Sequence, residues 1–319
     1  MPISLQTIDG NFKGKDILSS DQFSKNDIDI ILRTSDKMKQ LVLLKGGESL
    51  LQQKIMTPLF FEPSSRTFSS FSAAMLRLGG SVIPLPNMQS TSVSKGETFE
   101  DTIQVFASYS DVLVIRHPEQ GKVNRAADIT SIPVINAGDG IGEHPTQALL
   151  DLYTMQETFG KIDGLHIVFF GELGHYRPVN SLAKLLTLFP TCKITFVSPL
   201  GGALQPATRE YLVAKGVSFS EIETIDSVIG DADVLYVTRV KKEFMTEELY
   251  KKIQGHYVVD KKLVSKMKKK SIILHALPRI DEIHTEVDSD QRALYFRTQT
   301  RNGMYVRMAL LALILGKAQ

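Results

Sequence analysis

The sequence predicts an α/β fold made of two doubly wound parallel-sheet domains. Short apolar runs rich in β-branched and aromatic residues alternate with longer segments of helical spacing, which is typical of parallel strands joined by helical crossovers. The length of 319 residues fits about two domains. The strand-like runs divide evenly between the two halves of the chain, so we expect four strands in each domain.

Eight apolar runs are expected to form these strands. In chain order they are 54–61, 81–86, 111–116, 133–138, 166–171, 193–198, 233–239 and 271–277. The helices expected between them have apolar residues three or four positions apart. The clearest of these helices are 69–79, 144–159, 179–189 and 245–253.

Two helices define the domain organisation. The helix at 144–159 begins with His-Pro, and proline suits the first helical position, so we expect this helix to bridge the domains. The closing segment 302–316 is apolar on almost every side, which predicts a buried helix packing back on the first domain. The expected first domain is therefore 1–147 plus 297–319, and the second is 148–296.

Composition excludes several classes of protein. The chain has 37 Lys+Arg and 35 Asp+Glu, so it lacks the strong positive field of nucleic-acid and membrane-surface binders. Its one cysteine, Cys192, excludes an intrachain disulfide and a cysteine-based zinc cluster. The first 20 residues show no signal-peptide pattern, and we expect a cytoplasmic location.

Common catalytic motifs are also missing. The sequence has no GxGxxG after a strand, no Walker lysine motif, no HExxH pattern and no GxSxG elbow. These absences argue against a dinucleotide-binding enzyme, a P-loop enzyme, a zinc protease and a serine hydrolase.

Cationic side chains follow the expected strands at their carboxyl ends, where ligands bind in open parallel sheets. They are Arg66, Lys95, Arg116, Arg177 and Arg239. Because the whole chain is nearly neutral, such a cluster is local. It predicts small substrates with several negative charges.

The segment Ser64-Ser65-Arg66-Thr67 lies at a strand-to-helix turn. Helix N-terminal amides, hydroxyls and a guanidinium suit phosphate, although the same hydroxyls also suit a plain helix cap. Lys95 taken alone also fits a solvated surface lysine.

Three further residues have a functional and a structural interpretation. His144 precedes the bridging helix, where a neutral imidazole can donate to a developing oxyanion, or it is a structural histidine. Arg177 and Arg239 can each bind a carboxylate through two hydrogen bonds, or they form surface ion pairs.

Taken together, several long segments resemble the carbamoyltransferase family, and within it the aspartate-specific branch. The segments include 60–82 (FFEPSSRTFSSFSAAMLRLGGSV), 92–102 (SVSKGETFEDT), 135–154 (INAGDGIGEHPTQALLDLYT) and 275–279 (HALPR). They follow the family order across nearly the whole chain. The resemblance implies transfer of the carbamoyl group of carbamoyl phosphate to the α-amino group of L-aspartate, in pyrimidine biosynthesis, with no cofactor and no metal.

The resemblance assigns the phosphate of carbamoyl phosphate to Ser64, Ser65, Arg66 and Thr67, and it implies that Arg116 bridges the phosphate and the carbonyl oxygen. The implied catalytic residues are Arg66, Thr67, Lys95, Arg116 and His144.

The other implied contacts orient the two substrates. Gln147 and the main-chain carbonyls of Leu277 and Pro278 hold the carbamoyl amine. The residues implied to bind aspartate are Lys95, Arg177, Arg239 and Lys241.

In the family the loop with Lys95, and a hydroxyl near Thr91 or Ser92, reaches into a neighbouring subunit. This implies a homotrimer with shared sites. A regulatory or dihydroorotase partner is a further option that the resemblance leaves open.

The chain departs from the family pattern mainly in the aspartate half. Lys241 replaces a glutamine, Phe244 replaces an arginine, and Ala276 replaces a proline. Tyr176 and Pro178 flank Arg177 where glycine and threonine are usual. In the first half of the chain, Ser65 replaces a common threonine.

Two alternatives therefore stay open. One is a carbamoyltransferase for another amino acceptor, although ornithine is disfavoured because that branch typically has a cysteine at the position of Ala276. The other is a catalytically weak homologue that binds carbamoyl phosphate or an active partner.

Overall fold

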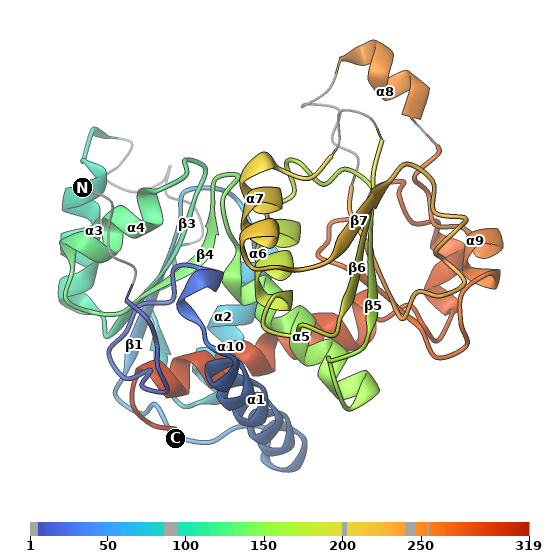
Figure 1. Cartoon of the computed structure of the whole chain (residues 1–319). Helices are drawn as coiled ribbons and strands as arrows, with labels where there is room; N and C mark the ends of the chain where they lie inside the picture. The colour runs from blue at the N-terminus through green and yellow to red at the C-terminus, as the bar shows by residue number, and fades with distance from the viewer. Residues whose placement is uncertain (1–5, 86–94, 200–202, 240–245, 254, 319) are drawn as a thin grey trace. The chain divides into compact units, whose positions relative to one another are not determined.

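The structure is a computed structural model that describes residues 6–85, 95–199, 203–239, 246–253 and 255–318 (Figure 1). It forms two compact units. Unit 1 comprises Met1–Tyr153 and Arg301–Gln319, and unit 2 comprises Thr154–Thr300.

Unit 1 is built on a parallel sheet with the strand order β2-β1-β3-β4. The strands are β1 (Ile55–Phe60), β2 (Ser81–Val82), β3 (Val112–His117) and β4 (Val134–Asp139). The helical segments are the 3₁₀ turn η1 (Ser20–Gln22), α1 (Lys25–Lys45), α2 (Ser65–Arg77), α3 (Phe99–Tyr109) and α4 (Lys122–Ile129). Two helices cross the boundary between the units, α5 (Pro145–Phe159) and α10 (Thr300–Ile314).

Unit 2 is built on a second parallel sheet, with the order β7-β6-β5-β8-β9. Its strands are β5 (His166–Phe170), β6 (Lys193–Val197), β7 (Phe219–Ile222), β8 (Val234–Val237) and β9 (Ile272–His275). The helical segments are α6 (Arg177–Leu186), α7 (Pro206–Ala214), α8 (Glu247–Ile253), α9 (Lys261–Ser265), the 3₁₀ turn η5 (Thr285–Ser289) and the π turn η6 (Tyr295–Gln299).

The inner strands of each sheet are buried on both faces, which explains their continuous apolar runs in the sequence. In β5, Val168 and Phe170 belong to an apolar cluster that includes Leu263 and Val264 of α9. Phe169, between them in the sequence, stacks on Phe196 of β6 with ring centroids 5.1 Å apart. In Figure 1, α6 and α7 lie on one side of the sheet of unit 2 and α9 lies on the other.

The predicted fold class is confirmed, and each of the eight predicted runs contains a strand. The expectation of four strands in the second half is wrong, because β7 adds a fifth strand. This strand has the sequence FSEI and pairs only with β6 at the sheet edge. Its central residues are exposed, so it lacks the apolar run that identifies the buried strands.

The closing helix α10 packs within the first unit, as predicted. The carbonyl of Ile314 accepts a hydrogen bond of 2.8 Å from the amide of Gly14. Arg307 is buried in this helix, where it donates to Ser70 Oγ at 2.9 Å and lies over the ring of Phe71. Burial lowers the pKa of Arg307 to about 10, although Asp151 acts in the opposite direction. The guanidinium therefore joins α10 to α2 in the buried interior of unit 1.

We expect Asp16→Asn to stabilise the protein more at pH 8 than at pH 5. Burial, opposed by a hydrogen bond from the Val134 amide, raises the pKa of Asp16 to about 6. Because the folded pKa exceeds the unfolded one, the contribution of this carboxyl is fully present below pH 4 or so and is lost as the pH rises through about 6. Asparagine keeps an oxygen acceptor for Val134. The increase in unfolding free energy that Asp16→Asn causes should be about 1 kcal/mol larger at pH 8 than at pH 5.

Calorimetric unfolding at the two pH values measures this difference. The matched control is Asp226→Asn, because the exposed Asp226 has its pKa lowered by a hydrogen bond from Lys266 and stays ionised over this range. The control should change Tm equally at both pH values. An equal change for Asp16→Asn would contradict the assignment.

Candidate active site

The segment after β1 forms the N-terminus of α2, and its features are those of helix N-termini that bind anions. Ser64 occupies the N-cap position of α2, but its side chain makes no capping hydrogen bond. Ser65 and Arg66 are exposed, and Thr67 is 8% exposed in the first helical turn. First-turn amides have no partner within the helix, and α2 has no acidic residue there to satisfy them. The hydroxyls, amides and guanidinium of this turn therefore suit a phosphate group better than a plain cap.

Arg116 connects three neighbouring strands of unit 1. It lies in β3, and its guanidinium is 3.0 Å from Glu62 Oε2, just beyond β1. Its Nη1 donates to the carbonyl of Ala137 in β4 at 3.4 Å. Only 12% of the Arg116 side chain is exposed, so this cation is fixed in place.

The Arg116–Glu62 pair marks the position where the strand order of the sheet reverses. In the order β2-β1-β3-β4, the chain winds outward in opposite directions from β1 and β3. In open α/β sheets, ligands bind at such a switch point, beyond the carboxyl ends of the strands. The loop Ser64–Thr67 and Arg116 thus lie at the binding edge of unit 1.

His144 and Gln147 extend this edge from the loop after β4. The loop is held by Glu143, which accepts hydrogen bonds from Ser19 Oγ at 2.8 Å and from the Ser20 amide at 2.7 Å. His144 is 5% exposed and Gln147 is 8% exposed, and the His144 carbonyl accepts from the Gln147 amide at 3.0 Å. Both side chains are therefore set at defined positions at the start of α5.

Asp151 orients the side chain of Gln147, and sequence reasoning did not identify it. Gln147 Nε2 donates to the fully buried Asp151 Oδ1 at 2.9 Å. Glutamine and aspartate four residues apart on a helix form such pairs, so the spacing held a signal. With its amide nitrogen engaged by Asp151, Gln147 has its amide oxygen as an acceptor for a substrate amine.

We expect Gln147→Glu to raise the KM for carbamoyl phosphate, the substrate that the sequence resemblance implies, about 10²-fold. The new carboxylate would lie where the amide is now 2.9 Å from Asp151, and juxtaposed like charges cost several kcal/mol. It would also repel an anionic substrate. Steady-state kinetics measure the effect. The control is Gln156→Glu, because Gln156 lies near the other end of the same helix, where its side chain donates to the carbonyl of Gly160 at 2.9 Å. Equal effects of the two variants would contradict the role of Gln147.

Unit 2 has its own cationic edge. Arg177 is the first residue of α6, after β5, and Arg239 follows β8; both are half-buried. Gly171 after β5 has φ +125°, and a Cβ there would lie 2.4 Å from the carbonyl of Thr238 after β8. The ends of β5 and β8 therefore approach closely, at the switch point of the second sheet. Arg177 and Arg239 both follow strands at this edge. Each guanidinium can bind one carboxylate group, so the edge suits a dicarboxylate ligand.

The remaining predicted residues lie on loops. Leu277 is half-buried with φ +57° and Pro278 is exposed, directly after β9 and joined by a cis peptide bond. Lys95 is exposed ahead of α3. Thr91, Ser92, Lys241 and Phe244 lie outside the described residues.

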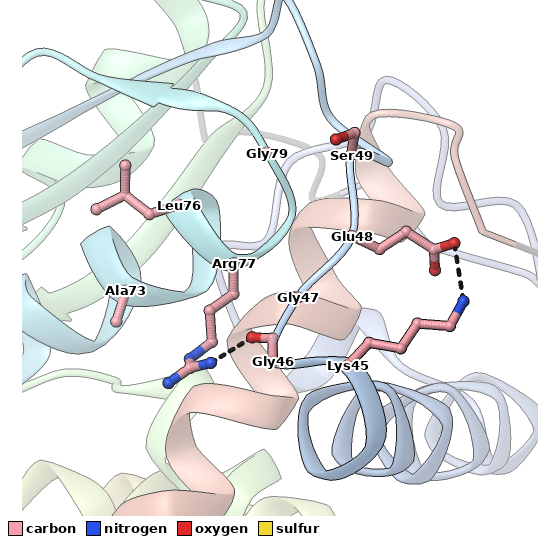
Figure 2. A pocket seen from close by; sticks show the side chains of 9 residues that line it. All are labelled: Lys45, Gly46, Gly47, Glu48, Ser49, Ala73, Leu76, Arg77 and Gly79. Atoms are coloured by element: carbon pink, nitrogen blue, oxygen red, sulfur yellow. Dashed lines mark hydrogen bonds and ion pairs between the residues drawn. The ribbon is translucent and has the colours of Figure 1, made fainter.

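A hollow of about 620 Å³ lies elsewhere in unit 1, between the C-terminal ends of α1 and α2 (Figure 2). Its cationic side chains already have partners within the chain. Lys45 pairs with Glu48 at 3.4 Å, and Arg77 donates to the carbonyl of Gly46. The hollow includes none of the predicted site residues, so we do not assign the chemistry to it.

Metal-ligating side chains and the cysteine are further candidates for chemistry among the described residues. Within the described part of the chain, no three His, Cys, Asp or Glu side chains are grouped so that they can hold a metal ion. Cys192 is buried, and burial raises the pKa of its thiol to about 11. No helix among the described residues has the length and apolarity needed to cross a membrane.

Comparisons with known proteins assign both units to one class of enzyme. Residues 15–157 match the carbamoyl-phosphate-binding domain of aspartate/ornithine carbamoyltransferases, and residues 163–314 match their Asp/Orn-binding domain. The chain thus belongs to the aspartate/ornithine carbamoyltransferase family.

Individual relatives lie on the aspartate side of this family. The aspartate carbamoyltransferase catalytic subunit of Thermococcus gammatolerans is 46% identical over 96% of this chain and 99% of its own length. The multifunctional protein CAD of Squalus acanthias is 45% identical over 96% of this chain, which spans 14% of that protein. A crystal structure of the Trypanosoma cruzi aspartate transcarbamoylase with carbamoyl aspartate and phosphate has a TM-score of 0.91 and 42% identity, covering 95% of this chain and 97% of that one.

Proposed function

We propose that this protein is an aspartate carbamoyltransferase. It transfers the carbamoyl group of carbamoyl phosphate to the α-amino group of L-aspartate, giving N-carbamoyl-L-aspartate and phosphate for pyrimidine biosynthesis. The observation that supports this most is the match at 46% identity to a dedicated catalytic subunit along nearly the full length of both chains. The cationic edges of both units agree with two anionic substrates.

In the proposed site, unit 1 supplies most of the groups for carbamoyl phosphate. Ser64, Ser65, Arg66 and Thr67 bind its phosphate, and Arg116 reaches both the phosphate and the carbonyl oxygen. His144 joins Thr67 and Arg116 in donating to that oxygen. Gln147, with the carbonyls of Leu277 and Pro278 from unit 2, accepts from the carbamoyl amine.

The reaction follows from these positions. Arg177, Arg239, Lys241 and Lys95 bind the aspartate carboxylates, and the lone pair of the uncharged α-amino group attacks the carbamoyl carbon. Negative charge then develops on the carbonyl oxygen, which the donors of unit 1 stabilise. The bond from carbon to the phosphate oxygen breaks, and the leaving phosphate takes the proton of the amine. Catalysis comes from holding two anions together and from fixed donors.

The proposal includes a homotrimer in which Lys95 completes the site of a neighbouring subunit. It also includes a cytoplasmic location. The proposed functional domains are 1–147 plus 297–319 for carbamoyl phosphate and 148–296 for aspartate.

Mixing two inactive variants tests the shared site. Lys95→Ala and Arg116→Ala chains, refolded together, should regain part of the activity, because some trimer sites would then contain no substitution. Activity that stays absent in verified mixed trimers would contradict the sharing.

The test of the function is production of carbamoyl-aspartate from carbamoyl phosphate and L-aspartate, with L-ornithine and other amino acids as parallel acceptors. Turnover with aspartate alone supports the proposal. Turnover with another acceptor alone would replace it by the second carbamoyltransferase hypothesis.

Lys241 and Phe244 motivate the remaining candidate, a catalytically weak homologue. The paired variant Lys241→Gln, Phe244→Arg measures this directly. A large gain in activity favours the weak homologue, whereas unchanged or lower activity shows that the natural residues serve the reaction.

A further inference from the structure

The backbone at Leu277 is held by a buried histidine. His275, the last residue of β9, is 1% exposed, and its Nδ1 accepts a hydrogen bond of 2.7 Å from the Leu277 amide. The amide of His275 donates in turn to Gln299 Oε1 at 2.9 Å. The imidazole thus fixes the Ala276–Leu277 peptide, which directly precedes the Leu277 carbonyl.

These contacts define the protonation of the ring. An Nδ1 that accepts a hydrogen bond has no proton, so this contact selects the tautomer in which the ring proton lies on Nε2. Nε2 lies 2.7 Å from Oε1 of Glu282, whose side chain is 2% exposed. The two atoms do not have hydrogen-bond geometry, but a carboxylate this close to Nε2 favours the same tautomer, because its negative charge attracts the N–H dipole and repels a nitrogen lone pair.

Glu282 is itself fixed by the turn that follows Pro278. Its Oε2 accepts hydrogen bonds from the amides of Ile280 at 3.0 Å and Asp281 at 3.2 Å, and its carbonyl accepts from Val259 at 2.9 Å. Burial acts to raise the pKa of Glu282, but His275 and the backbone amides outweigh it, so the pKa lies below the ordinary value. The carboxylate stays charged where it faces the imidazole.

We propose that His275 is a positioning residue for recognition of the carbamoyl amine, and that Glu282 acts through it by fixing the tautomer. This inference rests on the proposed function, in which the carbonyls of Leu277 and Pro278 accept from that amine. His275 touches the backbone and not the substrate. Its loss should therefore affect ligands that have the amine and spare ligands that lack it.

The test compares three ligands on the full chain. Carbamoyl phosphate has the amine, acetyl phosphate has a methyl group in its place, and inorganic phosphate lacks the acyl group. We expect His275→Leu to weaken carbamoyl phosphate binding about 10-fold to 10²-fold, the effect of one or two lost hydrogen bonds. Binding of acetyl phosphate and phosphate should change less than about twofold.

A conservative variant distinguishes positioning from general damage. Asparagine places an amide oxygen near the position of Nδ1, so His275→Asn should recover most of the carbamoyl phosphate affinity. Glu282→Gln, which keeps the side-chain size, should reduce that affinity in the same direction as His275→Leu. His284→Leu is the matched control, because His284 lies in the same segment with 54% of its side chain exposed.

Each outcome decides between the alternatives. A selective loss for carbamoyl phosphate with rescue by asparagine supports the proposal. Equal losses for all three ligands, or no loss in folded His275→Leu and Glu282→Gln proteins, would overturn it. Failure of the unmodified protein to bind carbamoyl phosphate would instead count against the proposed function.

Discussion

Arg116→Ala is expected to lower kcat by about 10³-fold, the effect of removing one fixed donor to a developing oxyanion. The guanidinium is fixed at the binding edge of unit 1, because it pairs with Glu62 and donates a hydrogen bond to the Ala137 carbonyl. Its removal would also leave the Glu62 carboxylate at an edge that must bind an anion. Binding of carbamoyl phosphate should therefore weaken together with turnover.

Initial rates of carbamoyl-aspartate formation, with unfolding midpoints to confirm the fold, measure this effect. The matched control is Arg125→Ala, since Arg125 pairs with Glu100 at 3.3 Å in unit 1 but is 55% exposed. Exposed pairs contribute at most about 1 kcal/mol, so the control should keep its activity within about twofold. A folded Arg116→Ala protein with ordinary turnover would remove Arg116 from the catalytic residues.

Arg239→Ala is expected to reduce kcat/KM for aspartate about 10²-fold to 10³-fold while phosphate still binds. A half-buried guanidinium at the β5/β8 switch point can make two charge-assisted hydrogen bonds to one carboxylate. Removing one partner of such a pair costs roughly 2–5 kcal/mol. The effect should fall on the acceptor because Arg239 belongs to unit 2.

Kinetics with each substrate varied in turn separate the two sites. Arg209→Ala is the control, because Arg209 forms an exposed pair with Glu221 at 2.7 Å in the same unit. If Arg239→Ala raised only the KM for carbamoyl phosphate, the division of substrates between the units would be wrong.

The sequence was sufficient to predict the parallel sheets and the location of the cationic residues. Strands such as β5 are buried on both faces, so they appear as continuous apolar runs, and parallel topology then brings their carboxyl ends to one edge. Ser64 and Arg177 were found for this reason, because each lies in the segment between a buried strand and the next helix.

The parts that were not predicted depend on contacts between distant segments. The Arg116–Glu62 pair requires β1 and β3 to be neighbours, which only the strand order provides. Arg307 lies in an almost wholly apolar helix, where sequence patterns give no reason to expect a buried cation; Ser70 and the ring of Phe71, both from α2, contact it. The edge strand β7 lacks an apolar run because only one of its long sides is paired.

The order of the units along the chain has a consequence for biosynthesis. Unit 2 is inserted into unit 1, so α10, the last helix of unit 1, leaves the ribosome after the whole of unit 2. Domains generally fold as units during synthesis, so unit 2 can complete its sheet while unit 1 still lacks a fully buried helix. The nascent first unit would expose the apolar surface that α10 later covers, and a chain shortened before residue 300 would be recognised by chaperones through unit 1 rather than unit 2.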